Sequence, residues 1–216
     1  MRKITKVFLF IIVSSFLISC NTTTEQESIT LSKKLLSTKL LNSERIKEKF
    51  GSYDIDVLSH TNKVRISNLY SFEEGTKVTR TFAVVNYPEQ IDSSYAAIHS
   101  KVIKGASIGR IFKKNRWSIV KVPLYKGTIP TKLKEFSYVY DLMSIQKNAL
   151  AFYMYDFHIQ KDGNDYKYAT ITEIYHPQYI NTKTLELLYK EQQIPIKKTP
   201  QVNQILNIVY AKMQSK

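Results

Sequence analysis

The sequence of 216 residues predicts an α+β fold, with one or more antiparallel sheets packed against helices. Segments of alternating apolar and polar residues are separated by short polar turns, as in β-hairpins. Other segments repeat apolar residues every three or four positions, which is typical of amphipathic helices. Both halves of the chain show strand-like segments followed by two helix-like ones. This order is consistent with a duplicated strand-strand-strand-helix-helix unit, although no residue-level repeat supports it.

In the first half, a short helix is expected to start at a capping side chain, Asn42 or Ser43, and to end at Gly51. Alternating patterns then predict three strands over residues 53–60, 63–70 and 77–87, joined by short polar turns. Two helices follow, one capped by Asp92 or Ser93 and one capped by Ser107. A further strand is expected to begin at Trp117 and to stop at Pro123.

In the second half, alternation from Phe136 to Asp141 predicts a strand. Residues 149–159 are apolar on both parities, which is typical of a central strand covered on two faces. A hairpin turn at residues 161–165 returns the chain through a strand over 166–175. Two helices are then expected, and the last has the clearest signature, because Thr199 can cap it and Pro200 fits its first turn.

The first twenty residues have the layout of an export signal. Three basic residues precede an apolar run from Val7 to Ile18, which is shorter than the roughly 20 residues of a membrane-spanning helix. The run ends in Leu17-Ile18-Ser19-Cys20, which resembles the lipobox of bacterial lipoprotein precursors. The resemblance implies cleavage before Cys20 and diacylglycerylation of its thiol, whose thiolate is the reactive form. The alternative is a plain signal peptide with an incidental cysteine.

These features divide the chain into three parts. Residues 1–19 are the predicted signal peptide, residues 20–41 the lipidated N-terminus and a polar tether, and residues 42–216 a basic globular domain. Two or more acyl chains give durable membrane attachment. In enteric lipoproteins an Asp after the lipidated cysteine marks inner-membrane retention, and Asn21 stands at this position. By that resemblance, the outer membrane is favoured if the host is Gram-negative.

The chain is strongly basic, with a net charge of +14, and loss of the three basic residues in the signal peptide leaves +11. This charge favours anionic partners. Behind an export signal these are anionic lipid, lipopolysaccharide, teichoic acid or peptidoglycan, and no nucleic acid is expected. Only six of the 32 basic residues are Arg, so a lysine bias of the genome is an additional explanation. Because Cys20 is the one cysteine, intramolecular disulfides are excluded.

Basic residues cluster between Lys101 and Lys134, where ten of them occur without an Asp or Glu. The six that precede Trp117 are candidates for contact with an anionic surface. They are Lys101, Lys104, Arg110, Lys113, Lys114 and Arg116. A solvated face enriched by lysine bias is the alternative. The glycines at 105 and 109 lack the Lys-Ser/Thr ending of a phosphate loop, which favours a simple turn.

The stretch from Phe50 to Gly127 is similar to poorly characterised proteobacterial proteins. The similarity lies in Ser67-Asn68-Leu69-Tyr70-Ser71, in Arg80-Thr81-Phe82-Ala83-Val84-Val85 and in residues 105–117. It implies no activity and no site residues.

Catalytic patterns are weak throughout the sequence. Asp156 and His158 share one face of a predicted strand, which suits an acid/base or metal pair, and Glu173 and His176 lie on the partner strand with opposite parity. No third ligand has recognisable spacing, so a hydrogen-bonded histidine is preferred, and no metal or cofactor is expected. The sequence therefore predicts a membrane-anchored, non-catalytic binding or scaffolding protein of the bacterial envelope. The less favoured alternative is a hydrolase that uses Asp156 and His158.

A second alternative is a glycan-binding module built on a tyrosine-rich hairpin. Six of the 15 tyrosines are concentrated on and beside that hairpin. They are Tyr153, Tyr155, Tyr166, Tyr168, Tyr175 and Tyr179. Tyrosine also favours strands, so packing in the core explains the same pattern.

Overall fold

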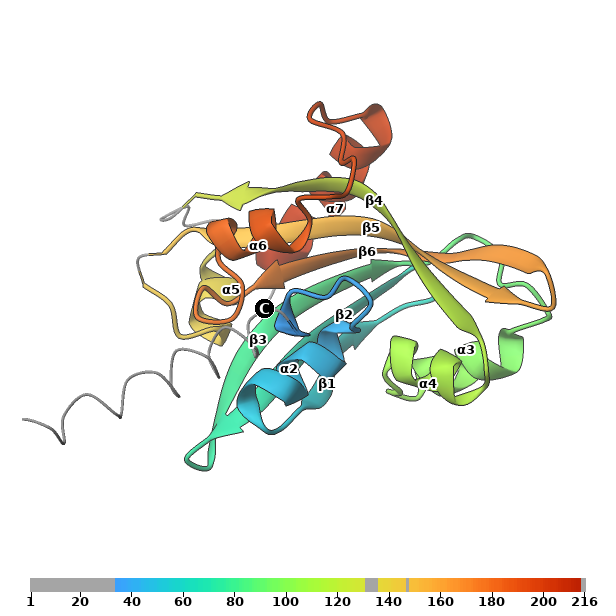
Figure 1. The fold of residues 1–216 in the computed structure, drawn as a ribbon, viewed down its shortest axis with the longest axis horizontal. Coiled ribbons are helices and arrows are strands. Elements are labelled where there is room, and N and C mark those ends of the chain that lie inside the picture. Colours follow the sequence, from blue (N-terminus) through green and yellow to red (C-terminus); the bar gives the residue numbers. More distant parts are fainter. Residues whose placement is uncertain (1–33, 131–135, 147, 215–216) are drawn as a thin grey trace, which may run out of the picture. The chain divides into compact units, whose positions relative to one another are not determined.

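The computed structural model describes residues 34–130, 136–146 and 148–214 (Figure 1). The lipobox, Cys20 and the start of the predicted tether lie outside the described residues. Residues 34–37 belong to a separate unit, in which the Ser37 N–H donates to the Lys34 carbonyl oxygen at 3.2 Å. The elements described next belong to the unit that begins at Thr38. Across the described ranges, no helix combines the length and the apolar character needed to cross a membrane.

Six strands form one antiparallel sheet in the order β1-β2-β3-β6-β5-β4 (Figure 1). Their bounds are β1 Asp54–His60, β2 Val64–Glu73, β3 Thr76–Asn86, β4 Ser118–Ile129, β5 Leu150–Lys161 and β6 Asn164–Tyr175. The two halves of the chain meet where β3 pairs with β6. The predicted α+β class, with an antiparallel sheet packed against helices, is confirmed. Residues 149–159, expected to form a central strand, lie in β5 between β6 and β4.

Two of the hairpins have two-residue turns that the sequence specifies directly. Glu74 and Gly75 join β2 to β3 with φ angles of 49° and 78°, and Asp162 and Gly163 join β5 to β6 with φ angles of 51° and 79°. Positive φ at both central positions defines the turn whose twist matches antiparallel strands, and Gly adopts it without steric cost. These turns set the strand register and therefore decide which side chains share a face.

Helices cover both faces of the sheet. They are α2 Asn42–Phe50, α3 Ala96–Ile103, α4 Ile108–Lys114, α5 Ser137–Leu142, α6 Thr182–Leu188 and α7 Pro200–Gln214. On one face, α5 and α7 pack on an apolar core that includes Phe82, Val84, Phe152 and Ile174. The α7 stripe is buried as predicted, and Thr199 Oγ1 accepts a hydrogen bond from the Val202 N–H at 3.2 Å. This is the apolar face of the sheet.

The opposite face, which we call the polar face, is covered by α2, α3, α4 and α6. Its buried side chains include two arginines, Arg65 and Arg80, and the carboxylate of Glu173. Burying such groups is costly unless each finds polar partners. The polar face therefore buries charged side chains, which an ordinary apolar core does not contain.

Three local predictions are wrong, and the side-chain caps predicted for α3 and α4 are also not formed. Residues 136–141 contain α5 and no strand, because Val139 and Tyr140 of the helix pack against the core beneath α7. Strand β4 continues past Pro123, since β4 is an edge strand and a register shift between Pro123 and Tyr125 absorbs the missing N–H. Helix α2 is capped by the Glu44 carboxylate, which accepts from the Leu41 N–H at 2.8 Å, and neither Asn42 nor Ser43 caps it.

Candidate functional site

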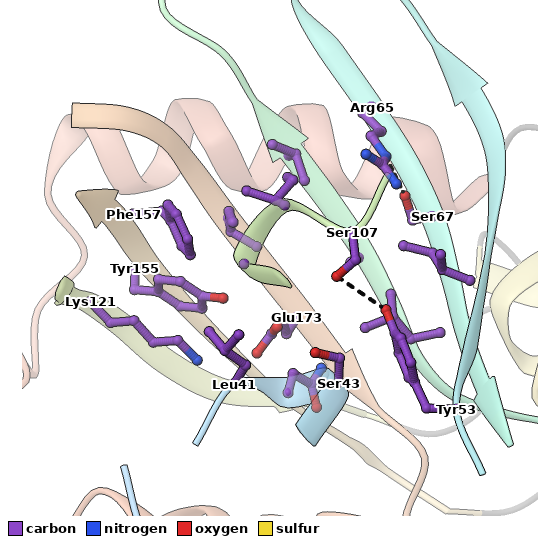
Figure 2. A pocket seen from close by; sticks show the side chains of 18 residues that line it. Leu41, Ser43, Tyr53, Arg65, Ser67, Ser107, Lys121, Tyr155, Phe157 and Glu173 are labelled. Atoms are coloured by element: carbon purple, nitrogen blue, oxygen red, sulfur yellow. Dashed lines mark hydrogen bonds between the residues drawn. The ribbon is translucent and has the colours of Figure 1, made fainter. Parts of the chain in front are cut away.

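A pocket of about 70 Å³ lies between the polar face and the first residues of α2 and α4 (Figure 2). We call it the inner pocket. All six strands contribute to its walls, and Leu41 and Ile108 close it from the helix side. Most of its lining is apolar, with Ile55, Leu69 and Ile171 among the wall residues. An apolar cavity with a few polar groups is the usual form of a small-molecule site.

Arg65 lies at one end of the inner pocket, where it anchors the connection between α3 and α4. Its guanidinium donates to the carbonyl oxygens of Val102 at 3.1 Å and Ala106 at 2.9 Å, and to Ser67 Oγ at 2.9 Å. The carbonyl oxygens at a helix C-terminus are negatively polarised, so they stabilise the buried cation. Arg65 is thus a structural group through Nε and Nη1, whereas its Nη2 is buried without a hydrogen-bond partner among the described residues.

Glu173 lies deeper in the inner pocket and is the centre of a buried polar cluster. Its carboxylate accepts a hydrogen bond from the Tyr175 hydroxyl at 2.8 Å, and the buried guanidinium of Arg45 supplies nearby positive charge. Burial, reinforced by the charge of Glu173, raises the pKa of Tyr155 and Tyr175. Both hydroxyls therefore stay protonated at neutral pH and remain available as donors.

Lys121 is a second group of the inner pocket with unused hydrogen-bonding capacity, besides the Nη2 of Arg65. Its side chain is half-buried, and its ammonium lies 4.8 Å from the centre of the Tyr155 ring. Within the described part of the chain, the ammonium has no hydrogen-bond acceptor and no ion-pair partner within bonding distance. Burial lowers the pKa of Lys121 to about 8, although the Glu173 carboxylate acts in the opposite direction. Figure 2 shows this side chain extending toward Leu41 and Glu173.

The six predicted surface residues are all exposed on α3, on α4 and in the residues that follow each helix. We call this surface the basic face. On α4, Arg110, Lys113 and Lys114 share one side of the helix, opposite the buried Ile108 and Phe112. Of the six, only Lys113 has an ion-pair partner among the described residues, Glu44 at 2.7 Å. The basic face is thus continuous in sequence and open to solvent.

The side chains proposed for a hydrolase are directed to different partners. Asp156 accepts from Thr170 Oγ1 at 2.5 Å and pairs with Lys167 at 2.8 Å. His158 instead contacts Asp165 at 2.7 Å, near the hairpin turn. Glu173 lies on the opposite face of the sheet from Asp156, as its parity predicts. The described residues contain no group of three or more metal-ligating side chains.

Burial at His176 disfavours its charged form. The side chain is 7% exposed, its Nδ1 accepts from the Gln178 N–H at 3.1 Å, and burial lowers its pKa to about 4. At neutral pH it is therefore a neutral, hydrogen-bonded histidine at the end of β6.

Most of the tyrosine-rich hairpin is interior. Tyr153, Tyr155, Tyr168, Tyr175 and Tyr179 are each at most 3% exposed, and only Tyr166 of the six predicted positions is partly accessible. Tyr153 stacks on Tyr155 and on Tyr189, with ring centroids 5.1 and 3.9 Å apart. These rings fill the space beneath α6, so their flat faces are not presented to a surface glycan.

Sequence reasoning did not find the inner pocket. The sequence shows Lys121 only as one of a run of basic residues, and it shows Glu173 only as a further candidate for a metal or acid/base group. A strand places Lys121 on the same face as Ile119 and Pro123, but Val120 and Val122 make the other face equally apolar, so the pattern does not show which face is covered. Neither a protein-family model nor a curated protein sequence matches this chain.

Proposed function

We propose that this chain is a lipid-anchored, non-catalytic protein of the bacterial envelope whose domain binds anionic lipid through the basic face. The observation that supports the proposal most directly is the charge of residues 96–117, which include six exposed basic side chains and no acidic one. Each basic residue close to an anionic membrane contributes about 1 kcal/mol to binding. The acyl chains on Cys20 supply the anchor, and the outer membrane is the favoured location in a Gram-negative host.

The basic face also includes an apolar contact. Ile103, between Lys101 and Lys104, is 49% exposed although it belongs to a helix that packs on the sheet. An exposed aliphatic side chain among lysines suits the boundary between headgroups and acyl chains, where apolar and cationic groups both gain contacts. This combination favours a lipid surface over a purely hydrophilic cell-wall polymer.

The test separates the anchor from the basic face. Full-length Cys20→Ser protein, which cannot be acylated, is sedimented with vesicles that contain phosphatidylglycerol, at low and high salt. Charge reversal by Lys101→Glu, Lys104→Glu and Lys114→Glu is expected to weaken binding about 100-fold at low salt, because about 3 kcal/mol or more of attraction is lost. Lys113 is left intact, since its pairing with Glu44 connects α4 to α2.

A matched control reverses three exposed lysines elsewhere, Lys183, Lys190 and Lys197, with the same change in net charge. This control is expected to retain most of the binding. Equal losses in the two triple variants would show a general charge effect and would refute a specific face. Binding to purified peptidoglycan or lipopolysaccharide but not to the vesicles would reassign the partner. Retention of wild-type acylation in Cys20→Ser, measured by palmitate labelling of cells, would refute the anchor.

A further inference from the structure

The inner pocket adjoins a second hollow at the surface, and we take their shared boundary as its entrance. Leu41 and Lys121 line both spaces, so these two side chains form the boundary between them. The outer hollow has a volume of about 420 Å³, and its lining includes three lysines, Lys39, Lys113 and Lys121, of which Lys113 pairs with Glu44. An anionic molecule that approaches this region is therefore attracted toward the entrance.

The boundary itself is closely packed on the helix side. A Cβ atom added at Gly109 of α4 would lie 2.8 Å from both Cδ atoms of Leu41. The absence of a side chain at Gly109 therefore lets Leu41, which is 5% exposed, lie directly over the pocket. The wall opposite is the sheet, so the position of Leu41 controls how much of the inner pocket is accessible.

The polar groups in the pocket differ in how fully they are used. Arg65 is bonded through Nε and Nη1 to two carbonyl oxygens and a hydroxyl, while its Nη2 is buried without a partner among the described residues, and Glu173 accepts from Tyr175. The Lys121 ammonium has three donors and no acceptor within bonding distance among the described residues, although the carboxylates of Glu173 and Glu44 act on it through space. A half-buried cation in this position lacks a directly bonded acceptor, which the oxygens of a bound carboxylate would supply.

We propose that the inner pocket binds a small monocarboxylate with an apolar body, whose carboxylate contacts Lys121 and whose body fills the space against the sheet. The volume has room for about five water molecules, which matches a body of about five carbon atoms. A single negative charge is preferred to two, because Glu173 lies in the same pocket and would repel a dianion. The inference does not depend on the lipid anchor or on the basic face.

The test uses the full-length chain and a set of probes that vary one feature at a time. Hexanoate has the proposed head and body, hexan-1-ol has the body with a neutral head, and acetate has the head alone. Titration calorimetry is expected to give a dissociation constant for hexanoate of about 1 mM or below, from burial of about five methylene groups and contact with Lys121. The other two probes are expected to bind at least about tenfold more weakly.

Two variants locate the site. Lys121→Met keeps a long side chain without the charge and is expected to weaken hexanoate binding at least about tenfold, while leaving hexan-1-ol unaffected. The matched control Lys114→Met removes the same charge from the basic face and is expected to leave hexanoate binding unchanged. Ala83→Leu, which adds volume to the β3 wall of the pocket, is expected to block both six-carbon probes.

Equal affinity for hexanoate and hexan-1-ol, or unchanged hexanoate binding in Lys121→Met, would overturn the proposal. No detectable hexanoate binding to the wild-type chain would overturn it as well. Lys121→Met is expected to sediment with anionic vesicles as the wild type does, so loss of the pocket and loss of the basic face give different results.

Discussion

Replacement of Lys121 by methionine is expected to stabilise the fold at neutral pH. The folded protein holds this ammonium in a half-buried site where its pKa falls to about 8, compared with an ordinary value of 10.5. At about 1.4 kcal/mol for each unit of pKa, keeping the group charged in the folded state costs about 3 kcal/mol. Loss of the contact with the Tyr155 ring offsets about 0.5–1 kcal/mol. The net gain expected for Lys121→Met is therefore about 2 kcal/mol.

The difference in stability between the wild type and Lys121→Met is expected to change with pH, and the two pKa values of Lys121 determine the direction of that change. Below a pH of about 8, Lys121 is protonated in both the folded and the unfolded wild type, so the full cost is present. Between about 8 and 10.5 the folded protein has released a proton that the unfolded chain still binds, so the wild type gains stability as the pH rises. The advantage of Lys121→Met is therefore expected to shrink over this range and to be largely lost near its upper end.

The measurement is urea denaturation of the two full-length proteins at about pH 7 and about pH 10, with the difference in unfolding free energy taken at each pH. Other groups titrate at high pH, but they are common to both proteins and cancel in this difference. Lys161→Met is the control, because Lys161 also lies over a ring, 5.6 Å from the Trp117 centroid, yet is exposed. Destabilisation of Lys121→Met at neutral pH, or a difference that does not change with pH, would refute the reasoning.

Three further substitutions test other parts of the polar face and its turns. Arg65→Met removes the donors to the Val102 and Ala106 carbonyl oxygens and is expected to cost about 2–3 kcal/mol, with faster amide exchange in α3 and α4 than in α7. Glu173→Gln is expected to cost about 1–3 kcal/mol in urea denaturation, because it removes the charged acceptor of Tyr175, and an unchanged midpoint would contradict that role. Gly163→Ala forces an alanine to a φ of 79° and is expected to lower the unfolding free energy measured in urea by about 1 kcal/mol.

The features that the sequence predicts well are those set by nearby residues. The turns at Glu74-Gly75 and Asp162-Gly163 combine a polar residue with a glycine, and the cap of α7 needs only Thr199 and the amide three positions later. Residues 136–141 show the limit of such signals. Their alternating tyrosines suit a strand, yet burial of Val139 and Tyr140 beside α7 stabilises a helix there, because packing outweighs a weak local preference.

The inner pocket could not be predicted, since it depends on contacts between distant positions. Leu41, Lys121 and Glu173 are separated by more than 50 residues from one to the next. The register of β4, β5 and β6 brings Lys121 and Glu173 to one face, and Leu41 reaches them from the start of α2. A one-residue shift of β4 would turn Lys121 to the other face of the sheet. The alternation in the sequence shows which strand residues share a face with Lys121, but it does not show which part of the chain covers that face.

The ten basic residues between Lys101 and Lys134 include both hydrated and partly desolvated side chains, and the two kinds are expected to bind anions with different salt dependence. The six residues of the basic face keep their water, so their attraction to an anion is long in range and is weakened by salt over a Debye length of about 10 Å at 0.1 M. Lys121 has lost part of its water, so a contact with it is short in range, stronger, and less affected by salt. Vesicle binding that falls steeply with salt, together with hexanoate binding that falls little, would therefore assign the two activities to separate parts of one basic sequence. The same salt dependence for both ligands would mean that Lys121 acts as an ordinary surface lysine.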